Sequence, residues 1–135
     1  MPNKTARKPK IVISRSDHDR LLGLADVIED REPALADVLI TELERARIVE
    51  DSKLPENVVR MGSTITYTAD DGEPQTATLV FPGDADIAAG KISITTPFGT
   101  ALIGLSPGQS IDWMARNGKT HRLTVTEVHQ PAEHA

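Results

Sequence analysis

The spacing of apolar residues changes once along this 135-residue chain, close to Pro55, and that change constrains the fold more than any other feature. Before Pro55 apolar residues recur every three or four positions, which predicts amphipathic helices, and after it they alternate with polar residues, which predicts strands. A run of helices followed by a run of strands favours the α+β class. We therefore expect a helical domain over residues 11–54, a sheet domain over residues 55–131, and tails at 1–10 and 132–135.

The helical segment should contain two helices. A capping-box pattern at residues 16–19 predicts the start of the first helix, and Pro33 suits the first turn of the second. Because the connection is short, the two helices should form an antiparallel hairpin. A first helix of about 14 residues is about 21 Å long. The predicted inward stripes are His18, Leu21, Leu22, Ala25 and Ile28 on the first helix and Leu35, Leu39, Leu43 and Ala46 on the second, which should end around residues 51–53.

The sheet segment is punctuated by turn signals. Asp70-Asp71-Gly72 and Asn117-Gly118 are typical of tight hairpins. Residues 101–105 lie between Pro97 and a Ser-Pro-Gly turn and suit one short helix. The expected strands cover residues 63–68, 75–81, 92–95, 110–113 and 119–128. Together these elements predict a small antiparallel sheet that carries one short helix.

The composition excludes several classes of protein. Hydrophobic residues make up 39% and charged residues 26% of the chain, which excludes wholesale disorder. No apolar run approaches the roughly 20 residues needed to span a bilayer, which excludes a membrane protein. The apolar run Ile11-Val12-Ile13 after the basic start is too short for the core of a signal peptide, so we expect a cytoplasmic protein. The absence of cysteine excludes disulfides, thiolate zinc sites and a cysteine nucleophile. Aromatic residues are few and dispersed in the sequence, too few for an aromatic-walled ligand pocket: Tyr67, Phe81, Phe98 and Trp113.

Charge is distributed unevenly. Residues 1–15 contain five basic residues and no acid, whereas residues 16–56 contain twelve acids and five bases. The simplest interpretation of residues 1–10 is a solvated basic tail. A weak, nonspecific contact with nucleic acid is the alternative.

An acidic cluster at the expected tip of the hairpin is the most interesting feature chemically. Glu29, Asp30 and Glu32 surround Arg31. Three carboxylates could hold a divalent cation, which prefers oxygen ligands, but a chain reversal also requires polar residues. Elsewhere, Asp84 and Asp86 suit a turn, and the four histidines lack the spacing of metal ligands. We expect no metal and no cofactor.

One segment resembles a known family. Residues 90–104, which read GKISITTPFGTALIG, resemble a block in the C-terminal domain of the GreA/GreB transcript-cleavage factors, and a glycine-containing turn follows at residues 106–110. Other segments are similar to the Rnk proteins, short members of that family. These segments are residues 41–48, 58–63, 79–82, 111–113 and 125–131.

The resemblance implies an FKBP-like sheet domain attached to a short antiparallel coiled-coil hairpin. It also implies RNA polymerase as the partner, with docking at the rim of the secondary channel. In cleavage factors, acidic residues at the tip of a long hairpin help to hold catalytic magnesium. The hairpin here is shorter, and carboxylates assist metal catalysis only within reach of the ion. We therefore expect a monomeric, non-catalytic regulator that competes with Gre-type factors.

We expect polymerase to contact an exposed surface on the family-like block, formed by Pro97, Gly99, Thr100, Ile103 and Gly104. Leu102 and Leu105 should belong to the core. The resemblance to the Rnk proteins also implies an effect on nucleoside diphosphate kinase levels, and we expect any such effect to be indirect, through regulation of expression. Two alternatives stay open: a cleavage factor that uses Asp30 and Glu32, and a prolyl isomerase suggested by the fold alone, which does not determine function.

Overall fold

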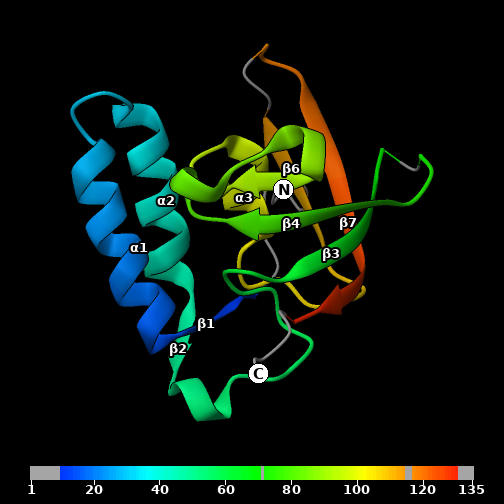
Figure 1. The fold of residues 1–135 in the computed structure, drawn as a ribbon, viewed down its shortest axis with the longest axis horizontal. Coiled ribbons are helices and arrows are strands. Elements are labelled where there is room, and N and C mark those ends of the chain that lie inside the picture. Colours follow the sequence, from blue (N-terminus) through cyan, green and yellow to red (C-terminus); the bar gives the residue numbers. More distant parts are fainter. Residues whose placement is uncertain (1–9, 71, 115–116, 131–135) are drawn as a thin grey trace, which may run out of the picture.

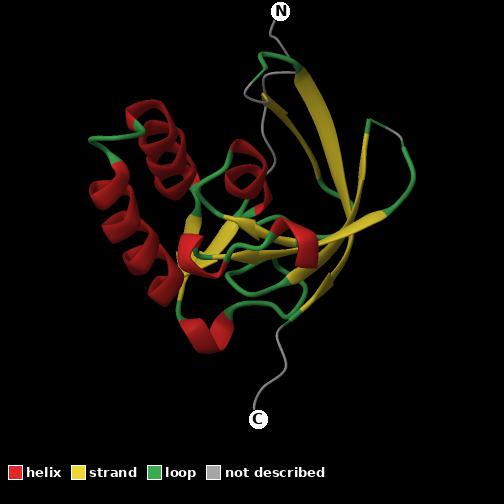
Figure 2. Ribbon diagram, turned by 45° about the horizontal axis from the view of Figure 1, so that its top comes forward, coloured by secondary structure: helices red, strands yellow, loops and turns green. Residues whose placement is uncertain are grey.

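The computed structural model describes residues 10–70, 72–114 and 117–130. A helical hairpin stands beside a curled five-stranded sheet, with a third, short helix between them (Figures 1 and 2). The helices are α1 (Arg15–Ile28), α2 (Pro33–Arg45) and α3 (Pro97–Leu102), with 3-10 turns η2 (Asp51–Lys53), η3 (Pro82–Asp84) and η4 (Ile87–Ala89). The strands are β1 (Val12–Ser14), β2 (Arg47–Val49), β3 (Thr64–Ala69), β4 (Gln75–Val80), β5 (Lys91–Ser93), β6 (Ser110–Met114) and β7 (Thr120–His129).

The predicted α+β architecture is confirmed. Both predicted tails, at 1–10 and 132–135, lie outside the described residues, apart from the exposed Lys10. Within the described ranges, no helix has the length and apolarity required to cross a bilayer.

The helical hairpin forms as predicted, but α1 starts earlier than its capping pattern indicated. Ser14, rather than Ser16, caps the helix, because its Oγ accepts a hydrogen bond from the Asp17 N–H at 3.2 Å. Asp17, Leu21 and Ala25 form the buried face of α1 at i, i+4 spacing. The prediction was wrong at Leu22, which is 40% exposed, since neighbouring positions differ by about 100° around a helix.

The second helix buries the leucines that the sequence singled out. Leu35, Leu39 and Leu43 all lie in the core. The helix ends at Arg45, however, and Ala46 already has extended backbone with ψ at 147°. The predicted continuation to residues 51–53 is wrong because the chain turns into a strand.

That strand belongs to a ladder that the sequence did not predict. β1 and β2 pair in parallel, with Val12 opposite Arg47 and Ser14 opposite Val49. The ladder therefore closes the base of the hairpin, since α1 and α2 together form the crossover between two parallel strands. Because its base is fixed by backbone pairing, the hairpin is not a free-standing coiled coil.

The main sheet has the strand order β5-β4-β3-β7-β6. The antiparallel pairs β3–β4, β3–β7 and β6–β7 agree with the prediction. The pair β4–β5 is parallel, which the sequence did not indicate. β6 lies at one edge of the sheet and pairs only with β7 among the described strands.

The short helix lies earlier than predicted. Thr96 caps α3, because its Oγ1 accepts the Gly99 N–H at 3.0 Å, and Pro97 occupies the first turn. The helix ends at Leu102, so Ile103 is extended and Gly104 has a positive φ of 82°. The Thr-Pro pair is therefore a helix start, which the prediction of a helix at 101–105 missed.

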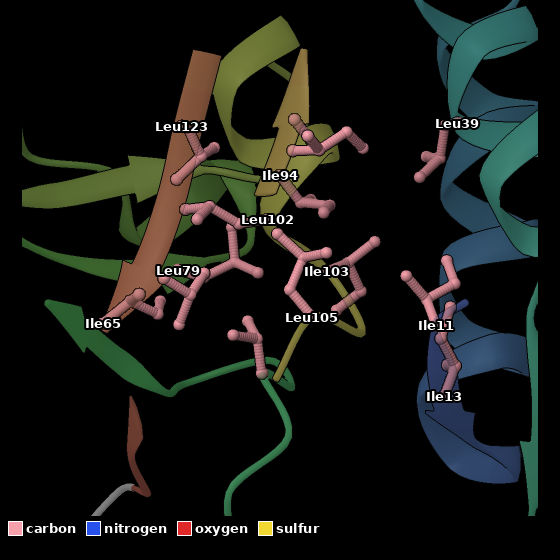
Figure 3. Packing of buried hydrophobic residues seen from close by; sticks show 14 of the residues in the cluster. Ile11, Ile13, Leu39, Ile65, Leu79, Ile94, Leu102, Ile103, Leu105 and Leu123 are labelled. Carbon is pink, nitrogen blue, oxygen red and sulfur yellow. The ribbon is translucent and has the colours of Figure 1, made fainter. Parts of the chain in front are cut away.

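The hairpin and the sheet share one hydrophobic core. Figure 3 shows Ile11 and Leu39 from the helical part beside Ile103 from the sheet part. The segment 103–105 lies between the two parts, since the Gly104 carbonyl accepts the Val12 N–H at 3.3 Å. These contacts hold the hairpin in a defined position on the sheet.

Two carboxylates strengthen the same junction. The Asp17 Oδ2 accepts the Met61 N–H at 3.0 Å, and burial raises the pKa of Asp17 above its usual value near 3.8. Asp51 accepts hydrogen bonds from the hydroxyl and the backbone N–H of Ser16, and these bonds lower the pKa of Asp51. The start of α1 is thus tied to η2, which follows β2, and to the loop that precedes β3.

Candidate partner-docking groove

The predicted docking block is largely buried. Gly99, Thr100, Ile103 and Gly104 all belong to the interior, and Ile103 is only 1% exposed. The expectation of an exposed surface at Thr100 and Ile103 is therefore wrong. Pro97 is half-buried at the start of α3.

Packing explains why this block has its particular residues. A Cβ on Gly99 would lie 2.1 Å from the Ser93 carbonyl oxygen, so only glycine fits there. The Thr100 hydroxyl donates to the Ile94 carbonyl at 2.7 Å, which satisfies a buried polar group. The residues that carry the family resemblance thus build the fold around α3.

The acidic tip is a solvated turn. Glu29, Asp30, Arg31 and Glu32 are all exposed between α1 and α2. The backbone N–H groups of Arg31 and Glu32 donate to the Ile28 carbonyl at 3.1 and 2.8 Å and close the helix end. Across the described part of the chain, no three side chains of the His, Cys, Asp or Glu type converge to hold a metal ion.

An open groove lies between α2 and β6, and sequence reasoning missed it. Its volume is about 400 Å³, within the range of protein ligand pockets. α3 lies between these two elements, as Figure 1 shows. The lining residues are Glu32, Ala34, Leu35, Val38, Glu42, Pro97, Thr100, Ala101, Ile111, Asp112, Trp113 and Met114. Two of the twelve, Pro97 and Thr100, belong to the predicted docking block.

The two sides of the groove expose apolar side chains. Val38 on α2 is 45% exposed, and Met114 on β6 is 61% exposed. Large apolar groups left in solvent around a concave site are typical of a binding surface. Three elements that are remote in sequence contribute to the groove, and no local pattern reveals such a juxtaposition.

An aromatic row supports the β6 side. Ring centroids are separated by 5.0 Å between Tyr67 and Phe98, 5.3 Å between Phe98 and Trp113, and 5.2 Å between Trp113 and His121. Three of the four aromatic residues, which are dispersed in the sequence, are therefore gathered in the fold. Only Trp113 of this row lines the groove. Its Nε1 is buried and has no hydrogen-bond partner among the described residues.

Ion pairs hold the polar side chains of the groove. The Arg45 guanidinium donates to Glu42 Oε1 at 2.7 and 3.0 Å, and Arg122 Nη1 donates to Asp112 Oδ1 at 3.1 Å. Of the described residues that line the groove, three are acids and none is basic. The groove therefore combines an apolar surface with acidic margins.

A further carboxylate positions the strand opposite Asp112. Asp70 accepts the Arg122 backbone N–H at 2.8 Å and lies 2.7 Å from His121 Nδ1. The bond from the Arg122 N–H, followed by the one to His121, lowers the pKa of Asp70 below its usual value near 3.8. This network links the turn after β3 to the β6 side of the groove.

Comparisons with known proteins match both parts of the chain. The family model for the C-terminal domain of the GreA/GreB transcription elongation factors matches residues 54–130, and the model for the Rnk N-terminus matches residues 9–49. The regulator of nucleoside diphosphate kinase from Escherichia coli K12 is 33% identical over 129 residues, which is 95% of each chain. The elongation factor GreA from Rhodospirillum rubrum is 36% identical over 132 residues, covering 90% of this chain and 84% of the relative.

A solved structure has the same fold. The GreA/GreB elongation factor from Nitrosomonas europaea superimposes with a TM-score of 0.72 at 37% identity, covering 89% of this chain and 99% of that one. Both halves of the chain thus have counterparts in the same group of transcription proteins. The chain belongs to the GreA/GreB family of transcription elongation factors and has an N-terminal part of the Rnk type.

Proposed function

We propose that this chain is a non-catalytic regulator that binds RNA polymerase at the rim of the secondary channel and competes there with Gre-type factors. Membership of a family of elongation factors and regulators supports this function. Binding to polymerase requires a cytoplasmic location in the bacterial cell. The name of the Escherichia coli relative connects it to nucleoside diphosphate kinase, and we propose that any such effect here acts indirectly, through gene expression.

We assign the docking surface to the groove between α2 and β6. The observation that carries this assignment is the exposure of Val38 and Met114 on either side of a concave, largely apolar surface. The buried part of the predicted block, residues 99–104, then contributes indirectly, because its packing holds α3 in position at the groove. Pro97 and Thr100 are the two predicted residues that line the groove itself.

The hairpin geometry supports a non-catalytic role. α1 has 14 residues, a length of about 21 Å. The β1–β2 ladder closes the base of the hairpin, and the hydrogen bond from the Val12 N–H to the Gly104 carbonyl holds that base against the sheet part. Magnesium ligands must lie about 2.0–2.1 Å from the ion, so a small shortfall in reach prevents coordination. Transcript cleavage by Asp30 and Glu32 is the alternative, and it needs acids that extend further.

Competition binding to core RNA polymerase tests the proposal. In this assay, the parent protein or a variant with Val38→Glu or Met114→Glu is added to core polymerase carrying a labelled Gre factor, and the release of the label is measured. We expect each change to weaken competition about tenfold or more, because a charge would have to be desolvated at the interface. Both side chains are exposed, so neither change should unfold the protein.

Val27→Glu is the matched control. Val27 is also an apolar helix residue, 71% exposed, but it lies on α1 and does not line the groove. Its variant should compete as the parent protein does. Failure of the parent protein to displace the Gre factor would refute polymerase docking, whereas unchanged competition by both groove variants would refute only the groove.

A further inference from the structure

The described chain begins next to the groove. The Gln109 Nε2 donates to the Lys10 carbonyl at 3.0 Å. Gln109 directly precedes β6, whose residues from Ile111 to Met114 line the groove. Residues 1–9 are therefore connected to the described chain near the start of β6, just before the residues of β6 that line the groove.

We propose that N-terminal residues 1–9 bind in the groove of the same molecule and compete with the partner for it. Whether the segment binds in the groove does not depend on the identity of the partner. That such binding would reduce partner binding rests on the proposed docking of RNA polymerase. The segment contains Lys4, Arg7 and Lys8 and no acid.

The segment has ample reach. Nine extended residues span about 30 Å. Along a strand, Asp112 lies three residues and therefore about 10 Å beyond Gln109. The whole β6 side of the groove thus lies within reach of a segment anchored at Lys10.

The charges and the apolar surface of the groove match the segment. The described lining residues include the acids Glu32, Glu42 and Asp112 and no base. Glu42 and Asp112 already pair with Arg45 and Arg122, and the three positive charges of the segment can join these ion pairs. Its apolar residues Met1, Pro2, Ala6 and Pro9 can cover the exposed apolar side chains.

The backbone offers further partners. β6 is an edge strand that pairs only with β7 among the described strands, so its other edge can pair with an extended peptide. The buried Trp113 Nε1 lacks a partner in the described part of the chain. An indole N–H is a donor only, and carbonyl groups of an extended peptide are suitable acceptors.

The contact can be weak and still occupy the groove. A short tether gives an effective concentration in the millimolar range, so an affinity of that order half-fills the site. Because ion pairs between exposed groups are screened, occupancy should fall as ionic strength rises.

Trp113 provides a direct test, since it is the single tryptophan of the chain and lines the groove. The full chain is compared with a variant that lacks residues 2–9, with a synthetic peptide of residues 1–9 added in trans. Removal should shift the Trp113 emission, and the peptide should reverse the shift with a millimolar midpoint that rises with salt. A control peptide with Lys4→Glu, Arg7→Glu and Lys8→Glu should have no effect.

An intact chain provides a second variant. Asp112→Asn keeps residues 1–9 but removes one negative charge from the groove, and it should make the emission less sensitive to salt than in the parent chain. Identical emission and salt dependence in the full and shortened chains, with no response to the peptide, would overturn the proposal.

Binding to polymerase reports the consequence. The shortened chain should bind core RNA polymerase severalfold more tightly than the full chain at low salt, with the difference lost at high salt. Weaker binding by the shortened chain would mean that the basic residues contact polymerase or nucleic acid, and would overturn the competitive role. If neither chain binds polymerase, the proposed function fails, while the fluorescence experiment still decides whether the groove is occupied.

Discussion

Gly104 and Ile11 approach each other so closely that a Cβ on Gly104 would lie 2.7 Å from the Cβ of Ile11. The two residues are 93 positions apart in sequence, and they join the start of the hairpin to the segment that follows α3. Gly104 also has a positive φ of 82°, which residues other than glycine adopt at a cost. This contact fixes the hairpin relative to the sheet.

Gly104→Ala should therefore destabilise the protein strongly. The left-handed backbone costs about 1–2 kcal/mol, and the clash with Ile11 adds about 1–3 kcal/mol of overpacking. Gly108→Ala is the matched control, because Gly108 has a φ of 91° but no neighbouring atom within 4 Å of the position that a Cβ would occupy. Urea unfolding should give a clearly larger loss of free energy for Gly104→Ala, and equal losses would contradict the close approach.

The interior of the hairpin can be tested with two leucines. Leu39 on α2 is fully buried, whereas Leu22 on α1 is 40% exposed. Leu39→Ala should cost about 2–5 kcal/mol, and Leu22→Ala should cost less than about 1 kcal/mol because it leaves no cavity. Equilibrium unfolding of both variants checks the orientation of the two helices. Similar losses would mean that Leu22 is buried and that α1 is rotated about its axis.

Local patterns predicted the regular elements well. The leucine stripe of α2 and the alternation in β3 and β7 reflect one buried face each, so the sequence contains the signal directly. The hairpin turn at Asp70 was also predicted, and Asp70 adopts the positive φ of 51° that Asp tolerates better than most residues.

Features that depend on distant partners could not be predicted. β1 and β2 have only three residues each, too few for a periodic signal. The strand β5 was predicted, but the parallel direction of the β4–β5 pair is decided by tertiary pairing. Leu22 and Leu21 are chemically identical, and only the packing of α1 distinguishes them. The family resemblance of residues 97–104 predicted a surface, whereas Gly99 and Gly104 are there because neighbouring backbone leaves no space for a side chain.

Asp17 should make stability depend on pH in an unusual direction. Burial raises its pKa, although the hydrogen bond from the Met61 N–H opposes the rise. The folded protein therefore holds this proton more tightly than the unfolded chain, so the Asp17 contribution to stability falls as pH rises from about 3.8 through the raised pKa.

Asp17→Asn should remove that dependence, since the amide oxygen can still accept the Met61 N–H without carrying a charge. Urea titrations from pH 3 to pH 7 should show the variant gaining stability relative to the parent as pH rises. Asp19→Asn is the control, because Asp19 is a largely exposed carboxylate on the same helix. A variant that loses stability relative to the parent toward neutral pH would mean that the charged form of Asp17 is the stabilising one.

The tip of the hairpin and the groove share Glu32. Asp30 is exposed on the turn and does not line the groove, whereas Glu32 does both. Asp30→Ala should leave polymerase binding and competition with Gre factors unchanged, while Glu32→Ala should alter binding through the groove.

Neither variant nor the parent should stimulate transcript cleavage in a backtracked elongation complex, because an arm of about 21 Å whose base is held against the sheet part cannot bring these carboxylates to the catalytic metal. Arg31 between the two acids adds repulsion against any cation. Cleavage by the parent protein that disappears in Asp30→Ala would show that the tip reaches the metal and that the protein is a cleavage factor.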